Sequence, residues 1–472
     1  MLYHELIEQH LDRESVAISD GVNSYSIRDL HQIAHRYQRF LELKGIVPGD
    51  RVIVVDHTPI ETIFVLLACL AGGFVFVPVS PHLDAETLDY MITDCGPSYI
   101  VDSDISLIGL TCKNTFERSM CPETSTAYII YTSGSEGRSK GVAASYVQIR
   151  YCVEAINERL KNSSNDRILC TLPLSFDYGL YQIFLALSSG ATLYVTQPGE
   201  VHRIPYLLSC WNITALPLVP SAANLLLKAN LLKQESSLSL RYITFTGETL
   251  SHKIVDELLY RFPNVKLVPM YGLTECKRVS VMPVERIDKV IAGSCGLPLR
   301  GVKVSLDDVD AITGIGKFVI EGPNVMRYWN IRDEDSHAFF VNPHNGKRCL
   351  VTGDYGWIDS EGFLYFAYRR NGLLKIAGYR ISVQWIETKL SRVEGVREVA
   401  VVGIPDEFTG ERAVCFVSLL PSGEKTNVLK TISTWPTYLK NSKIVFWSDE
   451  LPKNTNQKID KKLLLKIMQE SY

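Results

Sequence analysis

A short segment near residue 130 combines residue types that suit a polyphosphate ligand. The stretch "YIIYTSGSEGRSKGV" (128–142) follows an apolar run and gathers hydroxyls, glycines and cations: Thr132, Ser133, Gly134, Ser135, Gly137, Arg138 and Lys140. Glycines let the backbone turn and approach a ligand closely, and N–H groups, hydroxyls and cations together cradle phosphates. The spacing differs from a Walker A loop, because no Gly-Lys-Ser/Thr closes it. An ordinary Gly/Ser-rich surface loop is the alternative interpretation.

The elements that must position such a loop alternate between strands and helices. "RVIVVDH", "IETIFVLLACLAGG" and "FVFVPVS" have the lengths and apolar patterns of a parallel strand–helix–strand unit. "RYITFTGETLSHKIVDELLYRF" repeats this order, with a Thr-Gly-Glu turn between a strand and an amphipathic helix. From about Gly293 short strands and turns predict a small β-rich subdomain, and the stretch after Ser382 predicts a small α+β domain.

Length and composition limit the class of protein. The 472 residues are too many for one core and predict two to four domains. Lys+Arg total 49 and Asp+Glu 52, so the net charge of −3 gives no electrostatic argument for a nucleic-acid or membrane partner. The 11 cysteines show neither C-x-x-C nor a nearby histidine cluster, which predicts free thiols in a reducing compartment, the cytoplasm. The charged N-terminus has no signal-peptide pattern, and the most apolar run (63–80) is interrupted by Gly72-Gly73 and Pro78, as in a buried helix and strand.

Five separated stretches, in order along nearly the whole chain, resemble the motifs of the adenylate-forming superfamily, which includes acyl-CoA synthetases, amino-acid adenylation domains and luciferases. They are "YTSGSEGRSKG", "MYGLTE" (270–275), "TGDYGWIDSEGFLYF" (352–366), "LLKIAGYRIS" (373–382) and "PKNTNQKIDKK" (452–462). One such motif is weak, whereas five in register are specific.

The resemblance implies an α/β fold and a two-step reaction. It implies a large N-terminal domain of α/β layers with a small β-barrel subdomain (1–370) and a small, mobile C-terminal α+β domain (371–472). A carboxylic acid would attack the α-phosphate of ATP, with Mg²⁺ as the metal, to give an acyl-adenylate and pyrophosphate. A thiol would then take the acyl group and release AMP.

The resemblance also implies roles for individual residues. Thr274 is expected at the α-phosphate and Glu275 on Mg²⁺, which neutralises the phosphates. Asp354 would accept hydrogen bonds from the ribose hydroxyls, and Lys458, on a short polar loop, is the expected catalytic lysine. The remaining residues implied to contact ATP are Thr132, Ser133, Gly134, Ser135, Gly137, Lys140, Gly247, Glu248, Tyr271, Gly272 and Arg369. A structural role for Lys140 and an ion-pair role for Arg369 are the alternatives.

Four positions depart from the superfamily's usual pattern. Ser139 replaces a proline, Gln457 replaces the glycine before the catalytic lysine, and Asn371 stands where the hinge usually has Asp or Lys. Tyr146 stands where a histidine that gates the acid site commonly follows the loop, which leaves that gating in doubt. A catalytically degenerate homologue is the alternative, although every class of direct ligand is present.

The acid pocket is expected after the phosphate loop. Phe176-Asp177 resembles the Phe-Asp of amino-acid-activating domains, in which the aspartate pairs with the substrate's ammonium. A buried carboxylate needs a partner, and either a substrate amine or a nearby cation of the chain would supply it. Arg278 would meet a second carboxylate or a polar group, or else point to solvent. By motif alignment the polar wall comprises Tyr178, Tyr181, Thr244, Thr246, Met270 and Arg278.

An amino acid is therefore the favoured substrate. Because no carrier domain follows the lysine motif, the expected acceptor is the phosphopantetheine thiol of a separate carrier protein; the alternative is an acyl-CoA ligase that uses coenzyme A and a small acid. A binding module without catalysis predicts loss of Lys458 or Glu275, and neither is lost. A luciferase-like oxygenase would be identified by light emission or oxygen uptake.

The first testable prediction concerns the expected hinge at Asn371. Asn371 and Gly372 tolerate the backbone changes that a rotating linker needs, whereas proline fixes φ. Asn371→Pro should therefore affect adenylation and thioester formation unequally, as measured by pyrophosphate release and thioester yield. Equal loss of both half-reactions, or of neither, would argue against a hinge here.

Overall fold

The computed structural model describes most of the chain. The described residues are 2–83, 85–101, 121–132, 139–232, 239–311, 313–331, 336, 338–369, 373–376, 379–406, 409–435, 437–454 and 458–470. The chain divides into two compact units. The first comprises Met1–Asp308, Phe318–Thr352 and Trp357–Tyr365, and the second comprises Val309–Lys317, Gly353–Gly356 and Phe366–Tyr472.

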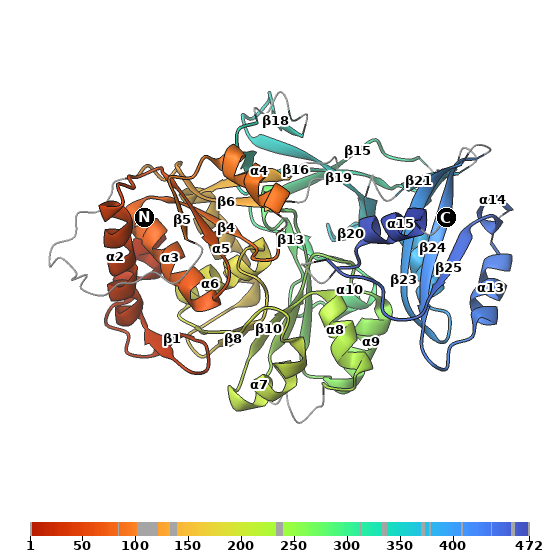
Figure 1. The fold of residues 1–472 in the computed structure, drawn as a ribbon, viewed down its shortest axis with the longest axis horizontal. Coiled ribbons are helices and arrows are strands. Elements are labelled where there is room, and N and C mark those ends of the chain that lie inside the picture. The colour runs from red at the N-terminus through yellow and green to blue at the C-terminus, as the bar shows by residue number, and fades with distance from the viewer. Residues whose placement is uncertain are drawn as a thin grey trace. The chain divides into compact units, whose positions relative to one another are not determined.

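The largest sheet of the first unit has nine strands, and its central strands are parallel (Figure 1). Their order is β14 (Leu297–Pro298), β13 (Ser280–Val281), β12 (Lys266–Tyr271), β11 (Tyr242–Phe245), β10 (Ala215–Leu218), β8 (Arg167–Cys170), β9 (Thr192–Val195), β1 (Val16–Ser19) and β2 (Ser24–Ser26). Strands β11 and β12 run directly into the Thr-Gly-Glu and Tyr-Gly-Leu-Thr-Glu stretches. Both motifs therefore lie at the carboxyl ends of neighbouring parallel strands, where open α/β sheets bind ligands.

A second sheet holds the two strands that flank the predicted phosphate loop. Its order is β17 (Arg327–Tyr328), β7 (Lys140–Ser145), β6 (Thr126–Thr132), β4 (Val75–Val79), β3 (Arg51–Val55) and β5 (Tyr99–Val101). Strands β3 and β4 are parallel and are joined by α3 (Pro59–Gly72), so the predicted strand–helix–strand unit is confirmed. The apolar run through α3 and β4 is buried in this unit.

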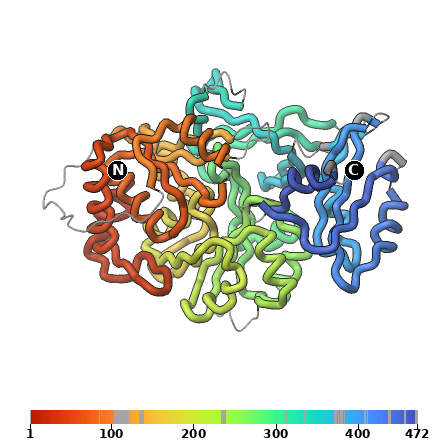
Figure 2. Tube along the Cα trace, in the orientation of Figure 1, coloured from red at the N-terminus to blue at the C-terminus, as the bar shows by residue number. Residues whose placement is uncertain are grey.

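Helices connect the strands of the first unit, and Figure 2 traces the chain from red at the N-terminus to blue at the C-terminus. They are α1 (Leu2–Leu6), α2 (Ile27–Leu43), α3, α4 (Ala85–Cys95), α5 (Tyr146–Leu160), α6 (Asp177–Ser189), α7 (Ile204–Cys210), α8 (Pro220–Lys228), α9 (His252–Arg261) and α10 (Ile287–Ile291). Helix α9 begins after Ser251, whose side chain accepts from the Ile254 N–H. This confirms the amphipathic helix predicted after the Thr-Gly-Glu turn.

Helix α6 carries the predicted acid-site residues. Its first residue is Asp177 and its last is Ser189, and it is capped by Gly190, whose φ of 76° is left-handed. A Cβ added at Gly179 would lie 2.2 Å from the Pro173 carbonyl oxygen, so the first turn needs a glycine to pack on the preceding segment. The apolar residues of α6 are buried over most of its length, which fixes the direction of its two tyrosines, Tyr178 and Tyr181.

The β-rich stretch expected after Gly293 forms a five-stranded sheet. Its order is β15 (Lys303–Asp307), β16 (Gly316–Glu321), β19 (Arg348–Ile358) and β18 (Phe339–Val341), with β20 (Leu364–Arg369) on β19.

The last stretch of the chain forms the predicted α+β arrangement. Its sheet has the order β22 (Tyr379–Ser382), β21 (Leu373–Ile376), β24 (Gly410–Leu419) and β23 (Val396–Asp406), and β25 (Lys443–Trp447) lies parallel to β24. Its helices are α12 (Val383–Ser391), α13 (Lys425–Ser433), α14 (Thr437–Lys440) and α15 (Lys461–Glu470). Alternate residues of β23 and β24 enter two separate apolar clusters, so both faces of the sheet are covered.

No described helix has the length and apolarity that a membrane crossing requires. Every cysteine in the described part of the chain is a free thiol.

Candidate active site

The predicted phosphate loop begins and ends on two strands that pair with each other. Thr132 is the last residue of β6 and Lys140 the first of β7, and the two are paired in the antiparallel register. The Thr132 hydroxyl donates to the Lys140 carbonyl at 3.4 Å. Ser133, Gly134, Ser135 and Gly137 lie outside the described residues, so their contacts with ATP stay predictions.

The loop that follows β12 is folded back on itself. A Cβ at Gly272 would lie 2.3 Å from the Lys277 carbonyl oxygen, so only glycine fits there. Thr274 and Glu275 lie in a 3-10 turn (Thr274–Cys276), and Tyr271 is buried against Phe318, with ring centroids 5.6 Å apart. The residues predicted to contact ATP, its α-phosphate and Mg²⁺ therefore lie within one tight turn.

Glu275 has the chemistry expected of a magnesium ligand. Its Oε1 accepts from the Tyr328 hydroxyl at 3.0 Å. Mg²⁺ prefers oxygen ligands and is commonly held by one or two carboxylates together with substrate phosphates. Among the described residues no cluster of three or more His, Cys, Asp or Glu could hold a metal ion alone. A magnesium ion at Glu275 would therefore need the oxygens of ATP as further ligands.

The Thr-Gly-Glu stretch after β11 makes structural contacts. The Thr246 hydroxyl accepts from Arg278 at 2.7 Å, and Gly247 has a φ of 87°, which is left-handed. The Glu248 carboxylate accepts from the Ser221 N–H at 3.0 Å, at the start of α8. Contacts of Gly247 and Glu248 with the nucleotide remain predictions.

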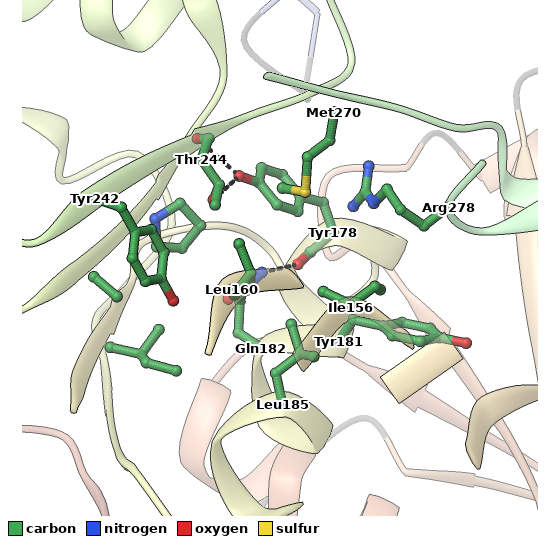
Figure 3. Close-up of a pocket in the computed structure, with 13 residues that line it drawn as sticks. Ile156, Leu160, Tyr178, Tyr181, Gln182, Leu185, Tyr242, Thr244, Met270 and Arg278 are labelled. Atoms are coloured by element: carbon green, nitrogen blue, oxygen red, sulfur yellow. Dashed lines mark hydrogen bonds between the residues drawn. The ribbon is translucent and has the colours of Figure 1, made fainter. Parts of the chain in front are cut away.

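Five of the predicted wall residues line one small cavity (Figure 3). The cavity has a volume of about 10 Å³, which is room for about one water molecule. An organic acid needs more space, so binding at the predicted wall would require some of these side chains to move. The Tyr178 hydroxyl forms hydrogen bonds with the Thr244 carbonyl oxygen at 2.9 Å and with the Thr244 side-chain oxygen at 2.6 Å. The five residues are Tyr178, Tyr181, Thr244, Met270 and Arg278.

Arg278 is a buried cation with an incomplete set of partners. It is only 3% exposed, and its guanidinium lies 5.3 Å from the centre of the Tyr178 ring. Among the described residues its side-chain acceptor is the neutral hydroxyl of Thr246, and its Nε has no hydrogen-bond partner there. The solvent-facing alternative for Arg278 is therefore wrong, and its buried positive charge lies at the cavity of Figure 3.

Asp177 has a charged partner from the chain itself. The Lys277 ammonium lies 3.1 Å from Asp177 Oδ2, donates to the Asp177 carbonyl at 2.6 Å and sits 4.1 Å from the centre of the Tyr181 ring. Lys277 is 1% exposed and has a left-handed φ of 41°, which is uncommon outside glycine. Burial lowers the pKa of Lys277 to about 7, against the opposing effect of the Asp177 carboxylate.

Lys277 was missed by the sequence analysis. The only signal in the sequence was a Lys-Arg pair directly after the Leu-Thr-Glu motif, where a loop cation is ordinarily solvated. Its contact with Asp177 favours the alternative in which a cation of the chain satisfies this carboxylate. The assignment of Asp177 to a substrate amine stays a prediction.

A second buried carboxylate holds the segment that leads into α6. Asp56 Oδ2 accepts from the Leu174 N–H at 2.8 Å and from the Ser175 N–H at 3.0 Å, and Oδ1 accepts from Thr62 at 2.9 Å. Burial raises the pKa of Asp56. These bonds connect the β3–α3 turn to the residues immediately before Phe176-Asp177.

Tyr146 begins α5 and is buried. Its hydroxyl has no hydrogen-bond partner among the described residues, and burial raises its pKa. It is not among the residues that line the cavity of Figure 3.

The second unit contains the remaining predicted residues. Asp354, in β19, accepts from Arg369 Nε at 2.7 Å, so the ion pair weighed for Arg369 is present. Lys458 lies in a turn closed by the bridge between Lys453 and Ile459, where its N–H donates to the Asn454 side chain at 3.1 Å. Asn371, the expected hinge, lies outside the described residues.

Other lysines near Lys458 have carboxylate partners. Lys453 lies 3.2 Å from Glu398 and 3.0 Å from Glu450, and Lys461 lies 2.7 Å from Glu387. The ammonium groups of Lys453 and Lys461 therefore form ion pairs within the second unit.

Comparison with known proteins gives matches along most of the chain. Residues 5–329 match the family described as AMP-binding enzyme, and residues 385–458 match the AMP-binding enzyme C-terminal domain. A curated relative, the probable non-canonical nonribosomal peptide synthetase CymA of Salinispora arenicola (strain CNS-205), is 30% identical over 98% of this chain. The chain spans only 18% and 6% of the length of the first two curated relatives it matches.

Two solved structures are similar in fold. ATP-bound MatB from Rhodopseudomonas palustris has a TM-score of 0.88 and 23% identity, and the alignment covers 100% of this chain and 99% of that chain. VinN in complex with L-aspartate has a TM-score of 0.69 and 27% identity, covering 78% of this chain and 98% of that chain.

Proposed function

The chain belongs to the AMP-binding enzyme family, and from this premise we propose which acid it activates. Its membership of the adenylate-forming superfamily and its α/β fold are confirmed. We propose that it is an AMP-forming ligase that uses ATP to adenylate a carboxylate. We propose that the acid is small and carries a second anionic group. The observation that carries this proposal is the buried Arg278 at the cavity.

The charge balance of the acid site supports a second anion. Lys277 and Asp177 form a pair, which leaves the charge of Arg278 unmatched by any described carboxylate. A buried charge without a partner is costly, so a ligand that supplies one gains a charge-assisted hydrogen bond. A carboxylate or a similar anion on the substrate would satisfy Arg278 and its Nε.

Within this class an acidic amino acid is our first candidate. The similarity to a nonribosomal peptide synthetase and the similarity to VinN, solved with L-aspartate, support an amino acid. The proposed acceptor is the phosphopantetheine thiol of a separate carrier protein. The second candidate is a dicarboxylic acid without an amine that is passed to coenzyme A, which the Lys277–Asp177 pair favours because Asp177 needs no further cation.

The reaction divides into two displacements, and the residues proposed for them act by positioning and charge. A carboxylate oxygen attacks the α-phosphorus and pyrophosphate leaves; a thiol then attacks the acyl carbon and AMP leaves. Lys140 and Thr274 would hold phosphate oxygens, and Asp354 would hold the ribose. Mg²⁺ at Glu275 would neutralise phosphate charge.

The proposal predicts a specific role for Arg278. Arg278→Gln should lower kcat/KM for acids with a second carboxylate by about 10- to 100-fold, because a hydrogen bond to a charged group is lost. Use of the matching monocarboxylic analogue should change by no more than about threefold. Acid-dependent pyrophosphate exchange measures both.

The same assay tests the substrate class. The panel comprises acidic amino acids, their des-amino analogues, neutral amino acids, fatty acids and aryl acids, with coenzyme A or a phosphopantetheine-loaded carrier protein as acceptor. A wild-type preference for a monocarboxylic acid over every acid with a second anion would overturn the proposal.

A further inference from the structure

One aromatic residue outside the predicted motifs touches two of the residues assigned to ATP and its metal. Tyr328 is the last residue of the two-residue strand β17, which pairs with β7 so that Tyr328 lies opposite Val142. Its hydroxyl donates to Glu275 Oε1 at 3.0 Å. On the other side, the Lys140 ammonium lies 5.2 Å from the centre of its ring.

The backbone around Tyr328 is fixed to the same two segments. The Met326 N–H donates to the Glu275 carbonyl at 2.8 Å, and the Trp329 N–H donates to the Gly141 carbonyl at 2.7 Å. The side chain is 9% exposed and packs edge-on against Phe339, with ring centroids 5.0 Å apart. Tyr328 is therefore held in place independently of any ligand.

We propose that Tyr328 is a positioning residue that couples the lysine at the end of the phosphate loop to the carboxylate assigned to magnesium. Its hydroxyl restricts the orientation of the Glu275 carboxylate and leaves Oε2 for a cation. Its ring holds the Lys140 ammonium through a cation–π contact, beside the place where phosphates are expected. This proposal rests on the roles proposed for Lys140 and Glu275 and is independent of which acid is used.

The two contacts of Tyr328 can be separated by substitution. Tyr328→Phe keeps the ring and removes the hydroxyl, whereas Tyr328→Leu removes both. Loss of a residue that orients a metal ligand typically weakens metal binding by about 10- to 100-fold. Tyr328→Phe should therefore raise, by about that factor, the Mg²⁺ concentration at half-maximal enhancement of ATP binding, with ATP binding in EDTA unchanged. Tyr328→Leu should also weaken ATP binding in EDTA.

The matched control is Tyr37→Phe. Tyr37 lies on α2, outside the predicted motifs, and its hydroxyl donates to the Glu61 carboxylate at 3.4 Å, so this variant removes a tyrosine–carboxylate hydrogen bond that does not involve the predicted metal ligand. Calorimetric titration of ATP with and without Mg²⁺ needs no acid and no turnover. We expect Tyr37→Phe to match the wild type.

The result that overturns the proposal is a Tyr328→Phe variant whose Mg²⁺ dependence stays within about threefold of the wild type. Glu275→Gln identifies where the failure lies. If Glu275→Gln shifts the Mg²⁺ dependence and Tyr328→Phe does not, the coupling is wrong and the metal role of Glu275 stands. If neither variant shifts it, the metal role of Glu275 is wrong as well, and the coupling fails with it.

Discussion

Replacing Lys458 with alanine is expected to lower acid-dependent adenylate formation by at least about 100-fold while ATP binding changes by less than about threefold. The ammonium would meet charge that develops as the carboxylate attacks the α-phosphate, so its contribution arises mainly in the transition state. The turn that carries Lys458 is closed by two hydrogen bonds: the Asn454 N–H donates to the Lys458 carbonyl at 2.7 Å, and the Lys458 N–H donates to the Asn454 side chain at 3.1 Å. These bonds do not involve the lysine side chain, so the alanine variant should keep the turn. Single-turnover pyrophosphate release and ATP titration measure the two quantities.

Lys462→Ala is the control for this experiment. Lys462 is exposed on α15, close in sequence to Lys458, and should be replaceable without effect. If Lys458→Ala released pyrophosphate within about threefold of the wild type, which is roughly 0.6 kcal/mol of barrier, Lys458 would not be the catalytic lysine.

The parts of the fold that the sequence predicts are those encoded by local patterns. The strand–helix–strand unit at β3, α3 and β4 follows from short apolar runs separated by turn residues. Once β11 and β12 are recognised as parallel neighbours, the motifs after them must meet at one edge of the sheet. The pocket wall, with Thr244 from β11 and Met270 from β12, follows from alignment with the superfamily's motifs, and the order of these strands brings the two residues to one cavity.

The contacts that the sequence does not predict join residues far apart in the chain. Asp177 and Lys277 are separated by 100 positions, and no pattern around either indicates that the other is its partner. Tyr328 reaches Glu275 and Lys140 only because a two-residue strand pairs with β7. A strand that short has no periodicity of its own. The sequence also leaves the orientation of the Arg278 side chain open, because a loop residue next to a lysine can face the interior or the solvent.

The Lys277–Asp177 pair predicts how the enzyme treats the amine of its substrate. Because Lys277 already neutralises Asp177, Asp177→Asn should lower kcat/KM for an amino acid and for its des-amino analogue by similar factors, with a lower melting temperature. Breaking a buried pair by removing one partner costs about 3–5 kcal/mol, whereas removing both charges is far less costly. The double variant Asp177→Asn/Lys277→Met should therefore recover much of the stability that either single variant loses. If instead Asp177→Asn abolishes a strong wild-type preference for the amine, Asp177 binds the substrate's ammonium.

Lys277→Met distinguishes the two roles of Asp177 more clearly, because it leaves the Asp177 carboxylate buried without a cation. An incoming ammonium would then replace the missing partner through a charge-assisted bond of about 1.5–3 kcal/mol. The variant should favour the amino acid over its des-amino analogue by about 10- to 100-fold more than the wild type does. Burial lowers the pKa of Lys277 to about 7, with Asp177, Arg278 and Cys152 as the other titratable groups that act on it. As the pH rises through 7 the lysine loses its proton and Asp177 its partner, so the wild-type preference for the amine should increase, and Lys277→Met should not show this step.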